Sequence, residues 1–136
     1  MELFEEITQA IQNLGGPSKI ELIHADEAKS VVATLKHVFI EGNPSKLWHG
    51  FKSQPLQLDC DDLEEIKGVI NNNFKDDIVY LILEDDNYYV IKTIPNLVTD
   101  ILKEIRFIEY YVVNISFNKL IAENDHSNVM LITPQT

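Results

Sequence analysis

Residues 78–94 have the sequence IVYLILEDDNYYVIKTI, two β-branched and aromatic runs separated by a short polar segment. Runs of this composition favour extended strands, and the acidic residues at 84–87 favour a tight turn between them. The stretch therefore predicts an antiparallel hairpin with strands at residues 78–83 and 88–94. This hairpin decides the fold class, because the strands that follow it are joined to one another by equally short connections.

Beyond the hairpin, three more apolar segments alternate with turn-forming residues such as Asn, Ser and Asp. Connections this short cannot make the crossovers that parallel strands need, so we expect a mainly antiparallel sheet. A short apolar run near the N-terminus predicts one further strand, for a total of about five or six. The predicted strands are residues 20–23, 78–83, 88–94, 110–115, 119–123 and 129–133.

Four segments place apolar residues three and four positions apart, as amphipathic helices do. Asp62 and Glu65 have the spacing of a capping box, and Pro95 suits the first turn of a helix. The predicted helices are residues 3–14, 26–39, 62–74 and 95–105. We expect these N-terminal and inserted helices to pack on one face of the sheet, which gives a single α+β domain over residues 1–136.

Between the second and third helices, residues 40–59 show no clear periodicity and contain two glycines and two prolines. The segment nevertheless holds Leu47, Trp48 and Phe51, which suggests that it is anchored to the core. Loops of this length are uncommon unless they are functional. Either a short helix lies near residues 46–51 or the segment binds another molecule.

The composition limits the possible functions. The chain has 136 residues, of which 45% are hydrophobic, and this suits one folded domain. Eleven basic and 22 acidic residues give a formal charge of −11, and there is a single arginine, Arg106. Binding to nucleic acid or to anionic membranes needs clustered cations, so both are disfavoured. Residues 61–136 carry 6 basic and 14 acidic side chains, so most of the negative charge lies in the strand-rich half.

The single cysteine, Cys60, cannot form an internal disulfide, and this is compatible with a reducing compartment. The first residues carry Glu2, Glu5 and Glu6 where a secretory signal needs cations and then an apolar run. No run of about 18 apolar residues occurs, as a membrane-spanning helix would need. We therefore expect a cytoplasmic protein.

The sequence shows no recognised catalytic or metal-binding motif, so we predict no metal and no cofactor. The four histidines are far apart in the sequence. His126 is the most interesting of them, because Glu123 and Asp125 beside it could orient the imidazole for acid–base chemistry. The alternative is that His126 is simply a polar residue in a turn.

Acidic residues in two predicted turns favour a binding function. Charge of this size attracts basic proteins and accelerates their association, although it also serves solubility. Trp48 or Phe51 could supply an apolar anchor at such an interface. The predicted partner-binding residues are Asp85, Asp86, Glu123, Asp125, His126 and Trp48.

Residues 109–126, EYYVVNISFNKLIAENDH, resemble the C-terminal signature of a small bacterial protein family in which a paired-aromatic strand leads to a strand ending in Glu-Asn-His-His. The sequence departs from that signature at Lys119, where tryptophan is expected, and at Asp125, where histidine is expected. The layout is also similar to toxin-immunity domains of the SUKH superfamily, which implies binding and blocking of a cognate toxin. The matching residues are Tyr110, Tyr111, Leu120, Ile121, Glu123, Asn124 and His126.

These observations lead to three hypotheses. The first is a small acidic cytoplasmic binding protein, not an enzyme, that acts as an immunity protein and neutralises a basic, nuclease-like toxin by occluding it. The second is a small-ligand-binding protein or minor enzyme with a site around His126, lined by Glu123 and by Tyr110 or Tyr111. The third is a homo-oligomeric module in which apolar strands pair between chains.

Overall fold

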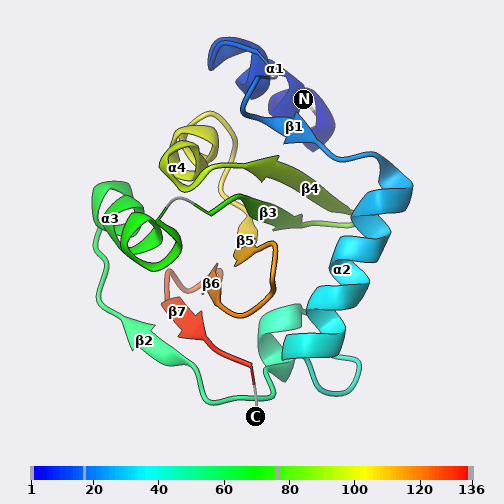
Figure 1. Ribbon diagram of the computed structural model, residues 1–136, viewed down its shortest axis with the longest axis vertical. Helices are drawn as coiled ribbons and strands as arrows, with labels where there is room; N and C mark the ends of the chain where they lie inside the picture. The colour runs from blue at the N-terminus through cyan, green and yellow to red at the C-terminus, as the bar shows by residue number, and fades with distance from the viewer. Residues whose placement is uncertain (1, 17, 76, 135–136) are drawn as a thin grey trace.

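The computed structural model describes residues 2–16, 18–75 and 77–134. Its centre is a seven-stranded sheet in which every pair of neighbours is antiparallel (Figure 1). The strands are β1 (Glu21–Leu22), β2 (Leu56–Leu58), β3 (Val79–Glu84), β4 (Tyr88–Thr93), β5 (Glu109–Asn114), β6 (Leu120–Glu123) and β7 (Val129–Ile132). Their order across the sheet is β1-β4-β3-β5-β6-β7-β2.

The predicted α+β class and antiparallel sheet are confirmed, and the four predicted helices are present. They are α1 (Leu3–Asn13), α2 (Ala25–Phe39), α3 (Leu63–Phe74) and α4 (Pro95–Lys103). Asp62 is the N-cap of α3, because its Oδ1 accepts the backbone N–H of Glu65 at 2.9 Å. The return bond differs from a regular capping box, since Glu65 Oε1 accepts the N–H of Asp61 at 3.1 Å, one residue before the cap. The seventh strand, β2, was not predicted.

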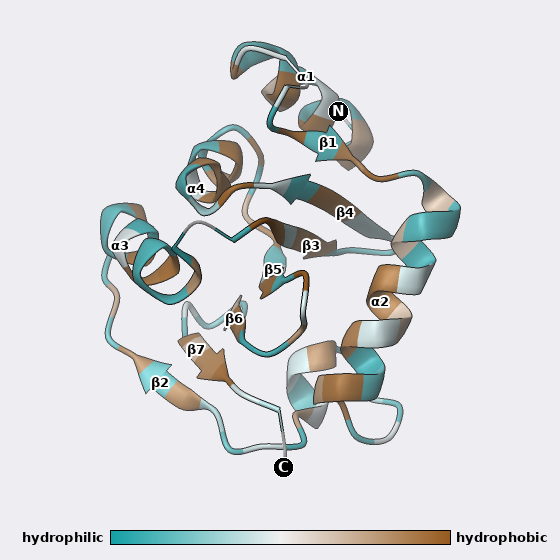
Figure 2. Ribbon diagram, in the orientation of Figure 1, coloured by the Kyte–Doolittle hydropathy of each residue, from teal (hydrophilic) through white to brown (hydrophobic). Residues whose placement is uncertain are grey.

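The expectation that the helices pack on one face of the sheet is wrong. Apolar residues of α1, α3 and α4 form one core with alternate residues of the strands, including Leu81 and Val112. The other residues of the same strands, including Ile82 and Val113, form a second core with α2. The sheet is therefore covered on both faces. In the hydropathy view β3 and β7 are mostly brown, as expected of strands whose side chains are apolar on both faces (Figure 2).

The segment at residues 40–59 contains a short 3₁₀-helix, η1 (Leu47–Gly50), as one of the two interpretations predicted. Backbone bonds close the loop that carries it: Glu41 N–H donates to Gly50 O at 2.7 Å, and Lys52 N–H donates to Phe39 O at 2.8 Å. A Cβ atom on Gly50 would lie 2.9 Å from the carbonyl oxygen of Glu41, so a side chain would not fit there. The loop is therefore a closed and packed structure.

The third hypothesis relied on the apolar strands at residues 78–83 and 129–132 pairing between chains. In the structure β3 lies between β4 and β5, and β7 lies between β6 and β2. Neither strand has a free edge, so this pairing is contradicted. The outer strands are β1 and β2, which have only two and three residues.

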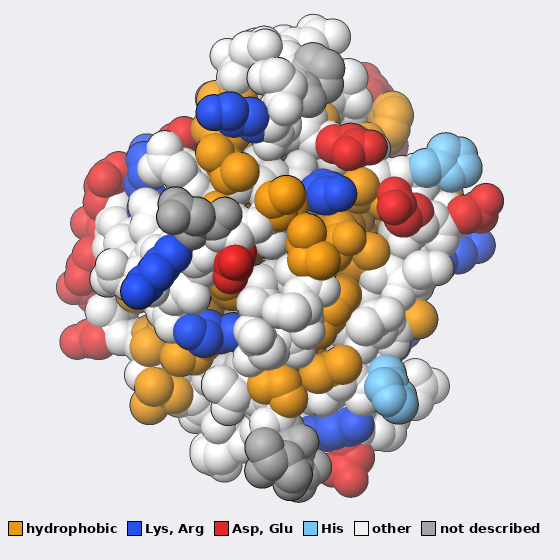
Figure 3. Space-filling model, in the orientation of Figure 1, with side chains coloured by type: hydrophobic (Ala, Val, Ile, Leu, Met, Phe, Trp, Pro, Cys, Tyr) orange, Lys and Arg blue, Asp and Glu red, His pale blue; other side chains and the backbone are white. Residues whose placement is uncertain are grey.

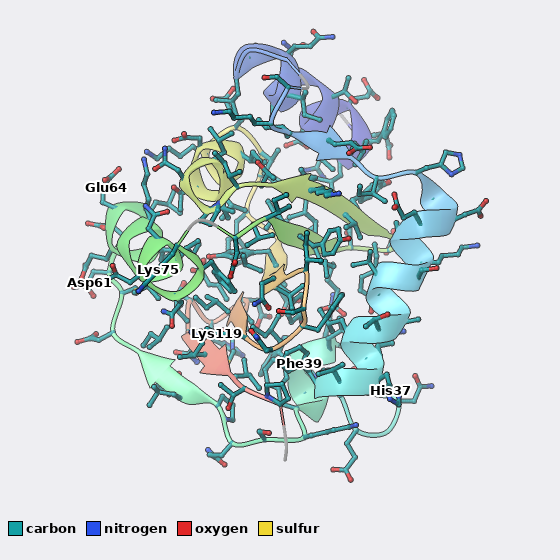
Figure 4. The ribbon with its side chains drawn as sticks, in the orientation of Figure 1. His37, Phe39, Asp61, Glu64, Lys75 and Lys119 are labelled. Carbon is teal, nitrogen blue, oxygen red and sulfur yellow. The ribbon has the colours of Figure 1, made fainter. Side chains whose placement is uncertain are left out.

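The strand directions concentrate acidic residues at one end of the sheet. The ends of β2, β3 and β6 and the starts of β4, β5 and β7 all lie there. In Figure 3 part of this charge is seen along the left rim over α3, where Figure 4 labels Asp61 and Glu64. The opposite end of the sheet carries lysines, of which Lys75 and Lys119 are labelled in Figure 4. We call the end of the sheet where β2, β3 and β6 finish the acidic end. Its acidic residues are Asp59, Asp61, Asp62, Glu84, Asp85, Asp86, Glu109, Glu123 and Asp125.

Candidate functional site

The register of the sheet places both predicted acidic turns on the same surface. Glu84, the last residue of β3, pairs with Glu109, the first residue of β5. Tyr110, next along β5, pairs with Glu123, the last residue of β6. Neighbouring strands lie about 4.8 Å apart, so two strand spacings, about 10 Å, separate the turns that follow β3 and β6. Residues about 40 positions apart in the sequence thus share one surface.

Asp85 and Asp86 form the turn between β3 and β4, and both are exposed. The backbone N–H of Asp85 donates to the carbonyl oxygen of Asn87 at 3.2 Å and closes the turn. The pKa of Arg106 is raised by its hydrogen bond to Glu6 and, to a lesser degree, by Asp85. The turn therefore presents two solvated carboxylates on a defined backbone.

The turn between β6 and β7 is held by Asn124, which is 2% exposed. Its side-chain oxygen accepts the backbone N–H of His126 at 2.9 Å and that of Asn128 at 3.1 Å. Asp125 and His126 point outward, and their side chains are 60% and 69% exposed. His126 Nε2 lies 3.5 Å from Asp125 Oδ1. An ion pair this exposed contributes little to stability. These two side chains are therefore available to a partner.

Trp48, in η1, lies beside this second turn. Its indole Nε1 donates a hydrogen bond to Glu109 Oε2, and its backbone N–H donates to Tyr111 Oη at 3.1 Å. The indole meets the ring of His126 edge-on, with ring centroids 6.0 Å apart. The structure thus brings together two predicted partner-binding residues that are 78 positions apart in the sequence.

A buried network that the sequence did not predict fixes η1 in this place. Glu84, only 4% exposed, accepts hydrogen bonds from Leu47 N–H at 3.1 Å, Tyr88 Oη at 3.0 Å and Tyr111 Oη at 2.6 Å. Burial and the nearby Glu84 carboxylate raise the pKa of both tyrosines, so their hydroxyls stay protonated and donate. Lys46 Nζ lies 3.3 Å from Glu109 Oε1.

The buried carboxylates of Glu84 and Glu109 have a structural role. Each is engaged by donors from η1 or the residue before it, and together they attach the loop to the sheet across more than 30 positions of sequence. The one sequence signal for this role is strand alternation, because Glu84 has the same parity as buried Ile82 and so points into the core. Loop residues 46–48 carry no comparable signal.

Glu123 lies apart from the other predicted partner-binding residues. It is half-buried on the face of the sheet opposite η1, beside its cross-strand partner Tyr110. Burial raises the pKa of Glu123, and the neighbouring Tyr110 phenol opposes this only in part. Tyr111 points to the other face and bonds to Glu84, and His126 is exposed. Of the residues in the second hypothesis, which needed His126, Glu123 and either Tyr110 or Tyr111, only Glu123 and Tyr110 share a cavity, and His126 lies outside it.

The acidic end thus offers exposed carboxylates in two turns and, beside the second turn, a tryptophan held by hydrogen bonds. Within the described residues, no three His, Cys, Asp or Glu side chains come together as a set of metal ligands. No helix among them has the length and apolar character needed to cross a membrane. No protein-family model, curated protein or solved structure matches the chain at a significant level.

Proposed function

We propose that this chain is a binding protein whose acidic end docks onto a basic protein, and that it acts as an immunity protein by occluding the cationic active site of a nuclease-like toxin. The observation that carries this proposal is the register of the sheet, which gathers the two acidic turns and Trp48 on one surface. Opposite charges across such a surface accelerate association and select the partner.

The exposed carboxylates of Asp85, Asp86 and Asp125 are the groups that would meet lysine or arginine side chains. The lysine closest to Trp48 along the chain, Lys46, is already paired with Glu109. Trp48 is half-buried, and its hydrogen bonds to Glu109 and Tyr111 hold it in one orientation. A rigid aromatic side chain loses little entropy on binding and therefore suits the centre of an interface.

Nucleases bind phosphate through clustered cations, and a rigid acidic surface competes for the same cations. The resemblance of residues 109–126 to a bacterial signature, and of the layout to toxin-immunity domains, favours this class of partner. The departures at Lys119 and Asp125 mean that no residue role is transferred from that resemblance. The role of each residue here rests on its exposure and charge.

A pair of charge-reversal variants tests the proposal. Asp85→Lys with Asp125→Lys changes one residue in each acidic turn, whereas Glu21→Lys with Asp77→Lys changes two exposed acids away from this surface. Each reversal adds two charges, so both variants have a formal charge of −11 + 4 = −7. A difference between the variants therefore reports position and not net charge.

The immobilised protein and both variants are used to capture partners from lysate of the native cells at low and moderate salt. We expect a single basic protein that salt releases, that the control variant retains and that the turn variant binds at least tenfold more weakly. The purified partner should lose nuclease activity when the wild-type protein is added. Equal capture by both variants, or capture of no basic protein, contradicts the proposal.

A further inference from the structure

The acidic end also contains a cavity of about 450 Å³, on the face of the sheet opposite Trp48. It lies between the start of α3, the segment after α4, and strands β5 and β6. Leu63, Ile66 and Ile105 give it apolar walls, and Tyr110 and Glu123 also line it. This volume is within the range of small-ligand sites, which combine apolar walls with a few polar groups.

Tyr110 is the first sign that the cavity is built for a ligand. The residue is 1% exposed, and its hydroxyl oxygen makes no well-formed hydrogen bond within the described chain, although burial and the adjacent Glu123 carboxylate both raise the pKa of this phenol. Buried polar groups are almost always bonded, so this phenol keeps an unused hydrogen-bonding position next to Glu123 at the cavity wall. Tyr111, the next residue, has its hydroxyl fully engaged by Glu84 and Trp48.

Glu123 supplies charge beside this hydroxyl. In residues 2–16, 18–75 and 77–134, no lysine or arginine lies at ion-pair distance from its carboxylate. The two cations on the cavity's rim are engaged with other acids, Lys103 with Glu64 at 3.4 Å and Arg106 with Glu6. This half-buried carboxylate is therefore desolvated with only the neighbouring Tyr110 phenol to offset part of the cost.

Other titratable groups around the cavity also influence which charge a ligand can carry. Burial and the surrounding acids raise the pKa of the Cys60 thiol, which therefore stays neutral. Asp61 and Asp62 are exposed and also line the cavity. The lining therefore holds three carboxylates against the two cations Lys103 and Arg106, a formal balance that favours a cation over an anion.

We propose that this cavity binds a primary ammonium group carried on an apolar stem. The nitrogen would donate hydrogen bonds to the Glu123 carboxylate and to Tyr110 Oη, and the stem would lie against Leu63, Ile66 and Ile105. The same chemistry occurs in free alkylamines and in lysine side chains of another protein. This inference stands apart from the proposed function, because it concerns the isolated protein and uses neither Asp85 nor Asp125.

The test is a titration of the isolated protein followed by ¹H–¹⁵N NMR, with n-hexylammonium, hexan-1-ol and hexanoate as probes. We expect n-hexylammonium to bind at least tenfold more tightly than the alcohol, with shifts at the cavity residues and not over the whole acidic surface. Hexanoate should not bind. Affinity for the amine should fall as the pH is lowered and Glu123 becomes protonated. Equal binding of amine and alcohol would show only an apolar cavity and overturn the proposal.

Two peptides distinguish the sources of the ammonium group. A blocked pentapeptide with a central lysine should bind if the cavity accepts a protein side chain, and the same peptide with norleucine should not. Binding of n-hexylammonium without the lysine peptide assigns the cavity to free amines. Binding of neither contradicts the inference and leaves the docking of a basic protein untouched.

Variants locate the site. Glu123→Gln should weaken n-hexylammonium binding at least tenfold and Tyr110→Phe several-fold, while the matched control Glu21→Gln, an exposed acid away from the cavity, should leave it unchanged. The NMR spectrum of each variant shows directly whether it is folded. An unchanged affinity in folded Glu123→Gln overturns the proposal.

Discussion

Tyr110 and Tyr111 are neighbours in β5, but their surroundings differ in almost every respect. The hydroxyl of Tyr111 donates to buried Glu84 and accepts the backbone N–H of Trp48. The hydroxyl of Tyr110, on the opposite face, makes no well-formed hydrogen bond among the described residues and lies next to Glu123, and both residues line a cavity. The two faces of the acidic end therefore differ in how completely their polar groups are bonded.

This difference separates residues that hold the fold together from residues whose polar groups remain open to a ligand. A buried carboxylate with three donors cannot be replaced without leaving those donors unbonded, so Glu84 holds the fold together. Glu123 has no cation partner in the described chain and contributes less to the fold. Four measurements of stability test this distinction, and all use urea denaturation of the isolated protein.

The largest effect is expected for Glu84→Ala. The change leaves the N–H of Leu47 and the hydroxyls of Tyr88 and Tyr111 without their acceptor, and we expect a loss of about 3 kcal/mol or more in the free energy of unfolding. Asp86→Ala, an exposed acid two residues away, is the control and should cost less than about 0.5 kcal/mol. Similar losses in both variants would contradict the structural role of Glu84.

The two tyrosines provide the closest matched pair. Tyr111→Phe removes a hydroxyl with two buried hydrogen bonds and should cost about 1–2 kcal/mol. Tyr110→Phe removes a hydroxyl without a partner, so its stability should be unchanged or slightly increased. If Tyr110→Phe is destabilised as much as Tyr111→Phe, then the Tyr110 hydroxyl is bonded in solution and the comparison fails.

Glu123→Gln should show a smaller effect whose size depends on pH. Burial raises the pKa of Glu123 in the folded state, so the protonated form is favoured by folding. This contribution is present below the ordinary glutamate pKa of about 4.3 and is lost as the pH rises through the folded-state pKa. Because the residue is half-exposed, we expect Glu123→Gln to be more stable than wild type at pH 7 by less than about 1 kcal/mol, with the gap closing near pH 4.

Glu6 provides a control for that pH experiment, because its pKa is shifted in the opposite direction. Its bond to Arg106 lowers the pKa of Glu6, so its contribution is present above the ordinary glutamate pKa and is lost on acidification. Glu6→Gln should therefore be less stable than wild type at neutral pH. Opposite signs for Glu6→Gln and Glu123→Gln are the expected outcome, and equal signs would show that Glu123 is paired after all.

The smallest effect belongs to the outer turn. Asp125→Asn removes one partner of an ion pair whose two side chains are 60% and 69% exposed, and we expect a change below about 0.5 kcal/mol. A larger loss would indicate that this turn is part of the scaffold and not a surface for a partner.

Much of the fold could be predicted because its elements follow local patterns. The hairpin was indicated by residues 78–94, and the helices by their apolar spacing and, for α3, by the cap at Asp62. The strand β2 was not predicted because it has only three residues and two of them are exposed. The covering of both faces had a signal in the unbroken apolar run of β3, which is typical of strands buried on both sides.

Less of the candidate site could be predicted. The exposed acids Asp85, Asp86 and Asp125 lie in turns, as their composition indicated, and Trp48 and His126 were chosen for separate reasons. That those last two meet, that Glu109 bonds to the indole and that Glu123 faces a cavity depend on contacts between distant segments. A pattern of neighbouring residues cannot predict contacts between segments that are distant in the sequence.

The sequence by itself determined the four helices, the longer strands, the antiparallel class of the sheet and the negative charge, because side-chain periodicity, turn composition and charge act over a few residues. Only the tertiary structure decided which acids share a surface and which are buried. The physical reason is register: the pairing of Glu84 with Glu109 and of Tyr110 with Glu123 is set by hydrogen bonds between strands. A shift of one residue would have moved each of these side chains to the other face.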